Sequence, residues 1–240
     1  MPNNTGHPDF SYAKYKRTVV VAPHPDDETL GCGGLVSGLR GLGGAVYVIF
    51  VTDGSASHPN SKIWPSARLA EQREKEAKDA LVCLGLQNEP RMFLRLVDAA
   101  MPPAGSPAWQ GAVLELREVL QSFSPDLAII PWRRDPHCDH RASWQLFHTA
   151  LKQTSAHPEE LEYAIWLEEF GKSEDYPRDG EAEAVRIDVS RAVKAKRAAI
   201  AAHKSQVSDL IDDDSDGFRL TPSTIARLTT TTETFWRPTR

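Results

Sequence analysis

The sequence predicts an α/β fold: a single domain with a Rossmann-like, mostly parallel, doubly wound sheet. Runs of apolar and β-branched residues alternate along the chain with longer segments of helical periodicity, which is the pattern of βαβ units. The runs Arg17–Ala22 and Ala45–Thr52 are almost continuously apolar, as in strands covered by helices on both faces. A length of 240 residues suits one large domain.

The elements can be placed in order from their boundaries. Pro23 and Pro25 stop the first strand, Gly43 and Gly44 follow the first helix, and Ser66 stands where it can cap the second. The expected strands are Arg17–Ala22, Ala45–Thr52, Arg91–Leu96, Asp126–Pro131, Leu161–Leu167 and Val185–Val189. The expected helices are Thr29–Leu42, Ser66–Leu86, Trp109–Phe123, His140–Lys152 and Arg191–Val207.

We expect one domain over residues 1–240, with a core of about residues 17–207 followed by an acidic loop and a C-terminal tail in residues 208–240. The charged segment Gly171–Glu183 is expected to be a loop. The tail is either a terminal strand or a loose arm. The acidic loop begins like an EF-hand, but Ser223 stands at position twelve instead of Glu, so we expect a solvated loop.

Composition excludes several classes of protein. The net charge is −5 and there is no long Lys/Arg block, so we expect no nucleic-acid partner. Met1–Lys16 lacks the apolar stretch of a secretory signal, and the longest apolar run, Ala45–Val51, is too short to span a bilayer. Three cysteines without CxxC spacing predict free thiols and a cytoplasmic location. The sequence leaves the oligomeric state open.

Two segments are dense in groups that bind metals or transfer protons. Pro23–Glu28 (PHPDDE) follows the first strand, and His137–His140 (HCDH) follows the strand Asp126–Pro131. In a doubly wound sheet of order 3-2-1-4-5 these two strands are neighbours at the topological switch point, where ligands bind. We therefore expect the two segments to converge.

The residue types in these segments suit zinc. A catalytic zinc needs three protein ligands and one open position, and His24, Asp27 and His140 could supply the three. Asp26 would then stand beside the metal as a general base. Cys138 is left out, because the residues between the two histidines of H-x-x-H usually point away.

The residues of these segments, and several others, also have a purely structural interpretation. The first segment could be a polar turn in which one Asp caps a helix, but a cap needs one Asp and not His-Pro-Asp-Asp-Glu. Arg73 lies on the apolar side of its helix and needs a carboxylate partner, which serves either structure or the site. His203 lies on an apolar line, where a satisfied core histidine is the usual case. Trp166, like Trp132 and Trp144, is assigned to the core.

The string A-P-H-P-D-D-E-T-L-G-C-G-G at Ala22–Gly34 resembles the signature of the PIG-L/LmbE-like metal-dependent N-deacetylases, and His137–His140 resembles their second motif. Weaker matches follow in the family's order: Thr52-Asp53-Gly54, R-x-x-E at Arg73–Glu76, and K-x-x-A-x-x-x-H-x-S-Q from Lys196 to Gln206. Together they span about residues 17–207.

The resemblance implies a set of roles. The metal, Zn²⁺ or another divalent ion such as Fe²⁺, would be bound by His24, Asp27 and His140, with Asp26 as the base. A protonated His137 would be the acid or oxyanion stabiliser, with Asp139 as its orienting partner. Arg73 and His203 would bind substrate. The implied reaction is hydrolysis of an N-acetyl group on a glucosamine-containing or similar small amide, which releases acetate.

Two other functions compete with this one. A metal-dependent phosphoester hydrolase on the same fold would need two metals or a cationic clamp, for which Arg133, Arg134 and Arg141 are near enough in sequence. A metal-binding module without turnover is disfavoured, because the proposed base is present.

Overall fold

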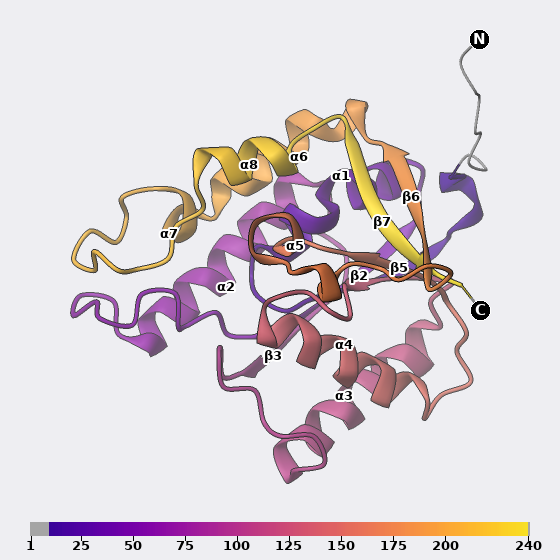
Figure 1. Cartoon of the computed structure of the whole chain (residues 1–240), viewed down its shortest axis with the longest axis horizontal. Helices are drawn as coiled ribbons and strands as arrows, with labels where there is room; N and C mark the ends of the chain where they lie inside the picture. Colours follow the sequence, from indigo (N-terminus) through magenta and orange to yellow (C-terminus); the bar gives the residue numbers. More distant parts are fainter. Residues whose placement is uncertain (1–9, 240) are drawn as a thin grey trace.

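The sheet has seven strands in the order β3-β2-β1-β4-β5-β7-β6 (Figure 1). β1 to β5 are parallel and have the predicted 3-2-1-4-5 order, whereas β7 pairs antiparallel with both β5 and β6. The strands are β1 (Arg17–Ala22), β2 (Ala45–Thr52), β3 (Arg91–Leu96), β4 (Leu127–Pro131), β5 (Glu159–Tyr163), β6 (Ala182–Asp188) and β7 (Thr232–Pro238).

This computed structural model describes residues 10–239. Residues 1–9 of the segment Met1–Lys16, to which the signal-peptide expectation applied, lie outside the described residues. The helices are α1 (Asp27–Gly41), α2 (Ser66–Cys83), α3 (Pro107–Phe123), α4 (Cys138–Leu151), α5 (Leu167–Phe170), α6 (Val193–Ala202), α7 (Lys204–Val207) and α8 (Pro222–Leu228).

Helices cover both faces of the sheet, as the continuous apolar strands predicted (Figure 1). One core cluster joins alternate residues of β1, such as Val20, to α1, α2 and α6. The other joins the intervening residues, such as Val19 and Val21, to α3 and α4. Among residues 10–239, no helix combines the length and apolarity that crossing a bilayer requires. All three cysteines are free, as predicted.

Several boundaries differ from the predictions. Helix α2 ends at Cys83 instead of Leu86, since Gly85 with φ +80° turns the chain, and Ser66 does not cap this helix. The predicted helix Arg191–Val207 is divided at His203, whose ψ of 60° is not helical. The predicted strand Leu161–Leu167 is instead Glu159–Tyr163. The tail, which the sequence left open, forms strand β7 inside the sheet.

Strand β7 also supplies a hydrogen-bond acceptor to helix α1. This helix is kinked at Cys32, and the N–H groups of Gly34 and Leu35 donate to the carboxylate of Glu233 on β7 (2.8 and 2.9 Å). Lys196 of α6 donates to the same carboxylate (2.7 Å) and to the carbonyl of Leu30 (2.8 Å). The buried pair Lys196–Glu233 therefore fixes the helix that follows the PHPDDE segment to the last strand of the sheet.

We expect Glu233→Ala to lower the free energy of unfolding by about 3–5 kcal/mol, because it leaves the buried ammonium of Lys196 unpaired. The matched control is Glu74→Ala, which removes pairs with the exposed cations of Lys78 and Arg95 and should cost less than about 1 kcal/mol. Urea denaturation of both variants measures the difference. Equal losses in the two variants would contradict the proposed contribution of the buried pair.

Candidate metal centre and the cavity around it

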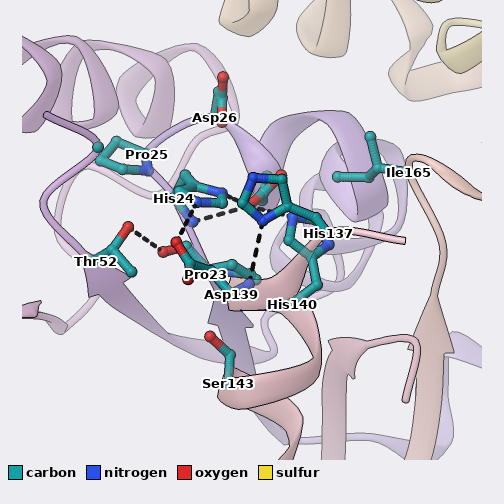
Figure 2. Close-up of polar contacts among 12 residues, drawn as sticks. Pro23, His24, Pro25, Asp26, Thr52, His137, Asp139, His140, Ser143 and Ile165 are labelled. Atoms are coloured by element: carbon teal, nitrogen blue, oxygen red, sulfur yellow. Dashed lines mark hydrogen bonds and ion pairs between the residues drawn. The ribbon is translucent and has the colours of Figure 1, made fainter. Parts of the chain in front are cut away.

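The two dense segments converge at the carboxyl ends of β1 and β4, which pair directly in the sheet. The segment after β1 carries His24 and leads into α1, whereas His137 is the N-cap residue of α4 and His140 lies in its first turn. Figure 2 shows the rings of these three histidines grouped together. One nitrogen from each lies within 4.8 Å of the others, so His24 and His140 are close enough to bind the same metal ion.

The carboxylate of Asp27 joins the two buried histidines. Its Oδ2 lies 3.0 Å from Nδ1 of His24 and 3.2 Å from Nε2 of His140, and it accepts the backbone N–H of His24 (2.8 Å). Neither ring nitrogen of His140 has a hydrogen bond of acceptable geometry within the described residues, although both are buried. The three ligands predicted from the sequence thus lie together, with an unsatisfied imidazole among them.

Three more carboxylates surround these imidazoles. Nε2 of His24 lies 3.2 Å from both Asp98 and Asp139, and Nδ1 of His140 lies 3.5 Å from Asp135. Asp135 is fixed by the N–H groups of His137, Ile165 and Trp166 (3.0–3.3 Å). Sequence reasoning missed Asp98 and Asp135, because each is a single Asp in a loop. The position of Asp135 two residues before the H-x-x-H segment was the available signal.

The charges in this cluster favour a cation. Burial alone would lower the pKa of His140, but the carboxylates of Asp27 and Asp135 outweigh burial and raise that pKa to about 9. Burial would also lower the pKa of His24, but hydrogen bonds to Asp139, Asp27 and Asp98 outweigh burial and raise that pKa. Four carboxylates face two imidazoles, so the group stays negative even with both rings protonated. Such an acid-rich donor set, with a buried unsatisfied nitrogen, fits a divalent metal.

His137 differs from the other two rings. Its Nδ1 accepts the backbone N–H of Asp139 (3.2 Å), so the neutral ring carries its proton on Nε2. Burial and the nearby rings of His24 and His140 lower the pKa of His137 to about 4. The backbone N–H of Asp139 contacts His137, whereas its carboxylate contacts His24.

Asp26 is held in a strained backbone conformation with φ 139°, which costs a non-glycine residue free energy. Its carboxylate pairs with Arg73 (3.1 Å), and Arg73 also donates to the carbonyls of Pro25 (2.7 Å) and Gly54 (2.9 Å). The prediction that Arg73 pairs with a carboxylate near the site is confirmed. Burial raises the pKa of Asp26 to about 6, although Arg73 opposes the shift. In Figure 2, Asp26 stands apart from the three imidazoles.

His203 does not contact the cavity, so the structure does not support direct substrate binding by this residue. Its Nε2 lies 3.4 Å from the buried carboxylate of Glu28, which accepts the backbone N–H of Asp26 (3.0 Å). Glu76 accepts both the N–H and the hydroxyl of Ser205 (2.9 and 2.6 Å). Arg73 of α2 and His203 after α6 therefore contact the PHPDDE segment, and the contacts between Glu76 and Ser205 join these two motifs to each other.

A cavity of about 420 Å³ opens over this cluster. One side of its lining contains two imidazoles, three carboxylates and the guanidinium of Arg73, and the other side, the aromatic wall, contains Trp166, Phe170 and Phe218. Trp166 packs in the core, as expected, and also contributes to that lining. The lining residues are His24, Asp26, Asp27, Ala56, Ser57, Arg73, Asp98, Ala99, Pro136, His137, Trp166, Phe170, Gln206 and Phe218.

The chain matches the family described as PIG-L: GlcNAc-PI de-N-acetylase over residues 19–151. Three solved structures share the fold. N,N′-diacetylchitobiose deacetylase from Pyrococcus horikoshii is 22% identical, with a TM-score of 0.63 over 82% of this chain and 73% of that one. The zinc-inhibited form of teicoplanin deacetylase Orf2 is 19% identical, with a TM-score of 0.64 over 92% and 97%. GalB, a 4-carboxy-2-hydroxymuconate hydratase from Pseudomonas putida KT2440, is 20% identical, with a TM-score of 0.63 over 78% of each chain.

We expect Gly54→Ala to destabilise the chain by about 3–5 kcal/mol, the cost of disturbing a buried charge pair. Gly54 has φ +66°, and an added Cβ would lie 2.6 Å from the guanidinium of Arg73. Gly85→Ala is the control, because it has φ +80° and open space around it. This control variant should lose only about 1–2 kcal/mol of stability, the cost of placing a residue with a Cβ in the left-handed region. Chemical denaturation compares the two, and equal losses would contradict a tight clamp by Arg73.

Proposed function

The chain belongs to the PIG-L family of metal-dependent N-deacetylases, and we propose that it removes the acetyl group from a glucosamine-containing or similar small N-acetylated substrate. The observation that carries the proposal is that Asp27 contacts both His24 and the buried His140 beside a cavity that His24, Asp26, Asp27 and His137 line. Two proteins of the same fold are named as deacetylases of N,N′-diacetylchitobiose and of teicoplanin, which supports this choice of reaction.

We assign His24, Asp27 and His140 as the metal ligands. Two imidazoles and one carboxylate with an open position suit zinc, and the same ligand types bind Fe²⁺. Zinc is our proposal for the metal. Because the solved form of Orf2 is named as zinc-inhibited, elemental analysis must be paired with activity at stoichiometric and excess metal. When bound, a divalent ion supplies Lewis acidity toward the acyl oxygen and toward water.

The side chains of this chain supply the remaining steps. The carboxylate of Asp26 takes a proton from water as the new C–O bond forms at the acetyl carbon. The Nε2–H of His137 donates to the acyl oxygen as negative charge develops there, because Nδ1 is already engaged. When the C–N bond breaks, Asp26 returns its proton to the departing nitrogen, and the products are acetate and the free amine.

The phosphoester alternative lacks a cationic clamp. Arg133 pairs with Glu162, Arg134 pairs with Glu181, and Arg141 donates to the carbonyls of Asp135 and Pro136. Of the described residues that line the cavity, Arg73 alone carries a guanidinium, and its partners are Asp26 and two carbonyls. An acetate-release screen over N-acetylated sugars, with elemental analysis of the purified chain, tests the proposal. A metal-loaded chain that released no acetate would refute it.

We also propose the cytoplasm as the compartment in which this chain works. All three cysteines are free, and Cys83 and Cys138 are exposed. Unpaired exposed thiols suit a reducing compartment.

Asp26→Asn should separate metal binding from chemistry. Asparagine keeps the shape of Asp26 but cannot accept a proton, so kcat should fall about 10²–10⁴-fold while the metal stays bound. Asp27→Asn should do the reverse and lose metal first, since Oδ2 of Asp27 contacts both buried histidines. Metal content and kcat are measured side by side. If Asp26→Asn loses the metal and Asp27→Asn keeps it, the two roles are inverted.

His137→Ala and His140→Ala should differ in the same way. His140→Ala removes a ligand and should lower metal content, whereas His137→Ala should keep the metal and lose about 10²–10³-fold in kcat, as for an oxyanion donor. Cys138→Ala, between the two, is the control and should keep both properties. Loss of metal from His137→Ala would instead support ligation by the three histidines.

A further inference from the structure

The aromatic wall of the cavity has no part in the chemistry proposed above. Of the three rings that form it, Trp166 has 9% of its surface exposed, whereas Phe218 is 39% and Phe170 is 63% exposed. The rings of Phe218 and Phe170 lie 5.6 and 5.7 Å from the ring of Trp166. Exposed apolar rings in the lining of a cavity that also contains buried carboxylates indicate a binding surface for an apolar group.

The acidic loop, expected to be solvated, holds Phe218 in this wall. The carboxylate of Asp213 accepts from the hydroxyl of Ser61 (2.6 Å) and from the N–H groups of Lys62 and Ile63 (2.8 and 3.0 Å). Asp214 accepts the N–H of Asn60 (2.8 Å). The N–H of Phe218 donates to the carbonyl of Ser57, which itself lines the cavity. In Figure 1 the loop after α7 and the loop before α2 extend to the same side.

We propose that Trp166, Phe170 and Phe218 determine specificity by contacting an uncharged apolar substituent on the amine side of the substrate, such as an aryl or alkyl aglycone of an N-acetylated amino sugar. This inference rests on the proposed deacetylation. Asp213 and Asp214 are positioning residues that act through Phe218.

The placement of the wall decides which part of the substrate it meets. The scissile acetyl group must lie beside His24 and Asp26, which are buried, whereas Phe170 and Phe218 are exposed, so the small methyl group is not the part of the substrate that covers these rings. The group beyond the amine nitrogen extends toward those rings. An anionic substituent is disfavoured, because Asp26, Asp27 and Asp98 line the cavity and the guanidinium of Arg73 is already engaged.

The experiment compares kcat/KM for phenyl N-acetyl-β-glucosaminide, free N-acetylglucosamine, N-acetylglucosamine 1-phosphate and N-octanoylglucosamine in the metal-loaded chain. The phenyl glycoside should exceed free N-acetylglucosamine by about tenfold or more, mainly through KM, since apolar pockets discriminate by about 10–200-fold per methylene. The double variant with Phe170→Ala and Phe218→Ala should lower the ratio of kcat/KM for the phenyl glycoside to kcat/KM for free N-acetylglucosamine towards one.

The control variant is Leu114→Ala, which removes an exposed apolar side chain of α3 outside the cavity and should leave the ratio as it is. Asp213→Ala with Asp214→Ala should lower the ratio, and Asp212→Ala, which removes a neighbouring carboxylate from the same loop, should not. If a double variant fails to fold, Phe170→Ala alone decides, because the exposed ring of Phe170 cannot be essential to the core.

The outcomes separate the two proposals. No acetate from any substrate refutes the deacetylation and this inference with it. Acetate release with a phenyl-to-free ratio near one, or with a ratio that the wall variants leave unchanged, refutes the aromatic wall and leaves the deacetylation intact. A preference for the phosphate or for the N-octanoyl compound also refutes it. A high ratio that falls in the wall variants supports it.

Discussion

Three consecutive carboxylates, Asp26, Asp27 and Glu28, are buried at the end of β1, and most of the site is organised around their charge. Burial of an acidic group without a partner costs several kcal/mol, so each of the three needs a cation or hydrogen-bond donors. The partners come from different parts of the chain. Arg73 of α2 serves Asp26, the histidines of the β1 and β4 loops serve Asp27, and Glu28 meets His203 between α6 and α7. The acidic triplet thus couples four segments that are distant in sequence.

The same requirement explains the glycine-rich start of α1. The segment that carries the carboxylates must pass closely between β5 and the C-terminal part of the chain. A Cβ at Gly31 would overlap the ring of Tyr163, and one at Gly34 would crowd Val189. The kink at Cys32 releases N–H groups that Glu233 of β7 then accepts. The last strand therefore helps to fix the helix whose first turn contains Asp27.

The part of the fold that could be predicted depends on local signals. Runs of β-branched residues predicted β1, β2 and β4. The expected strand order, which places β1 beside β4, then predicted that the PHPDDE and HCDH segments lie close together. The insertion of β7 between β5 and β6 could not be predicted, because its pairing partners are set by long-range contacts and its sequence has no distinctive pattern. The break at His203 was missed, since the Ala-rich periodicity continues through it. At the break the buried Nε2 of His203 lies 3.4 Å from the carboxylate of Glu28, a long-range contact that the local sequence pattern does not show.

Within the site, the residues of contiguous motifs were found and the isolated ones were not. His24, Asp27 and His140 follow from spacing and strand order. Asp98 and Asp135 each stand alone in a loop, and their proximity to the imidazoles depends on how those loops fold. Trp166 packs in the core as predicted, but its position beside the cavity was not predicted, because a large aromatic residue after a strand has the same sequence pattern in both cases.

The two halves of the cavity are built differently, and this separates chemistry from selectivity. The ligands and Asp26 follow β1 and β4, central strands whose neighbours on both sides fix their ends. The aromatic half comes from the short helix α5 and from a loop that two carboxylates attach to the segment before α2. Loops tolerate substitution better than central strands do. The aromatic rings share no hydrogen bond or ion pair with His24, Asp27 or His140 in the described structure, so substitutions in the proposed apolar subsite can leave the geometry of the proposed metal ligands unchanged.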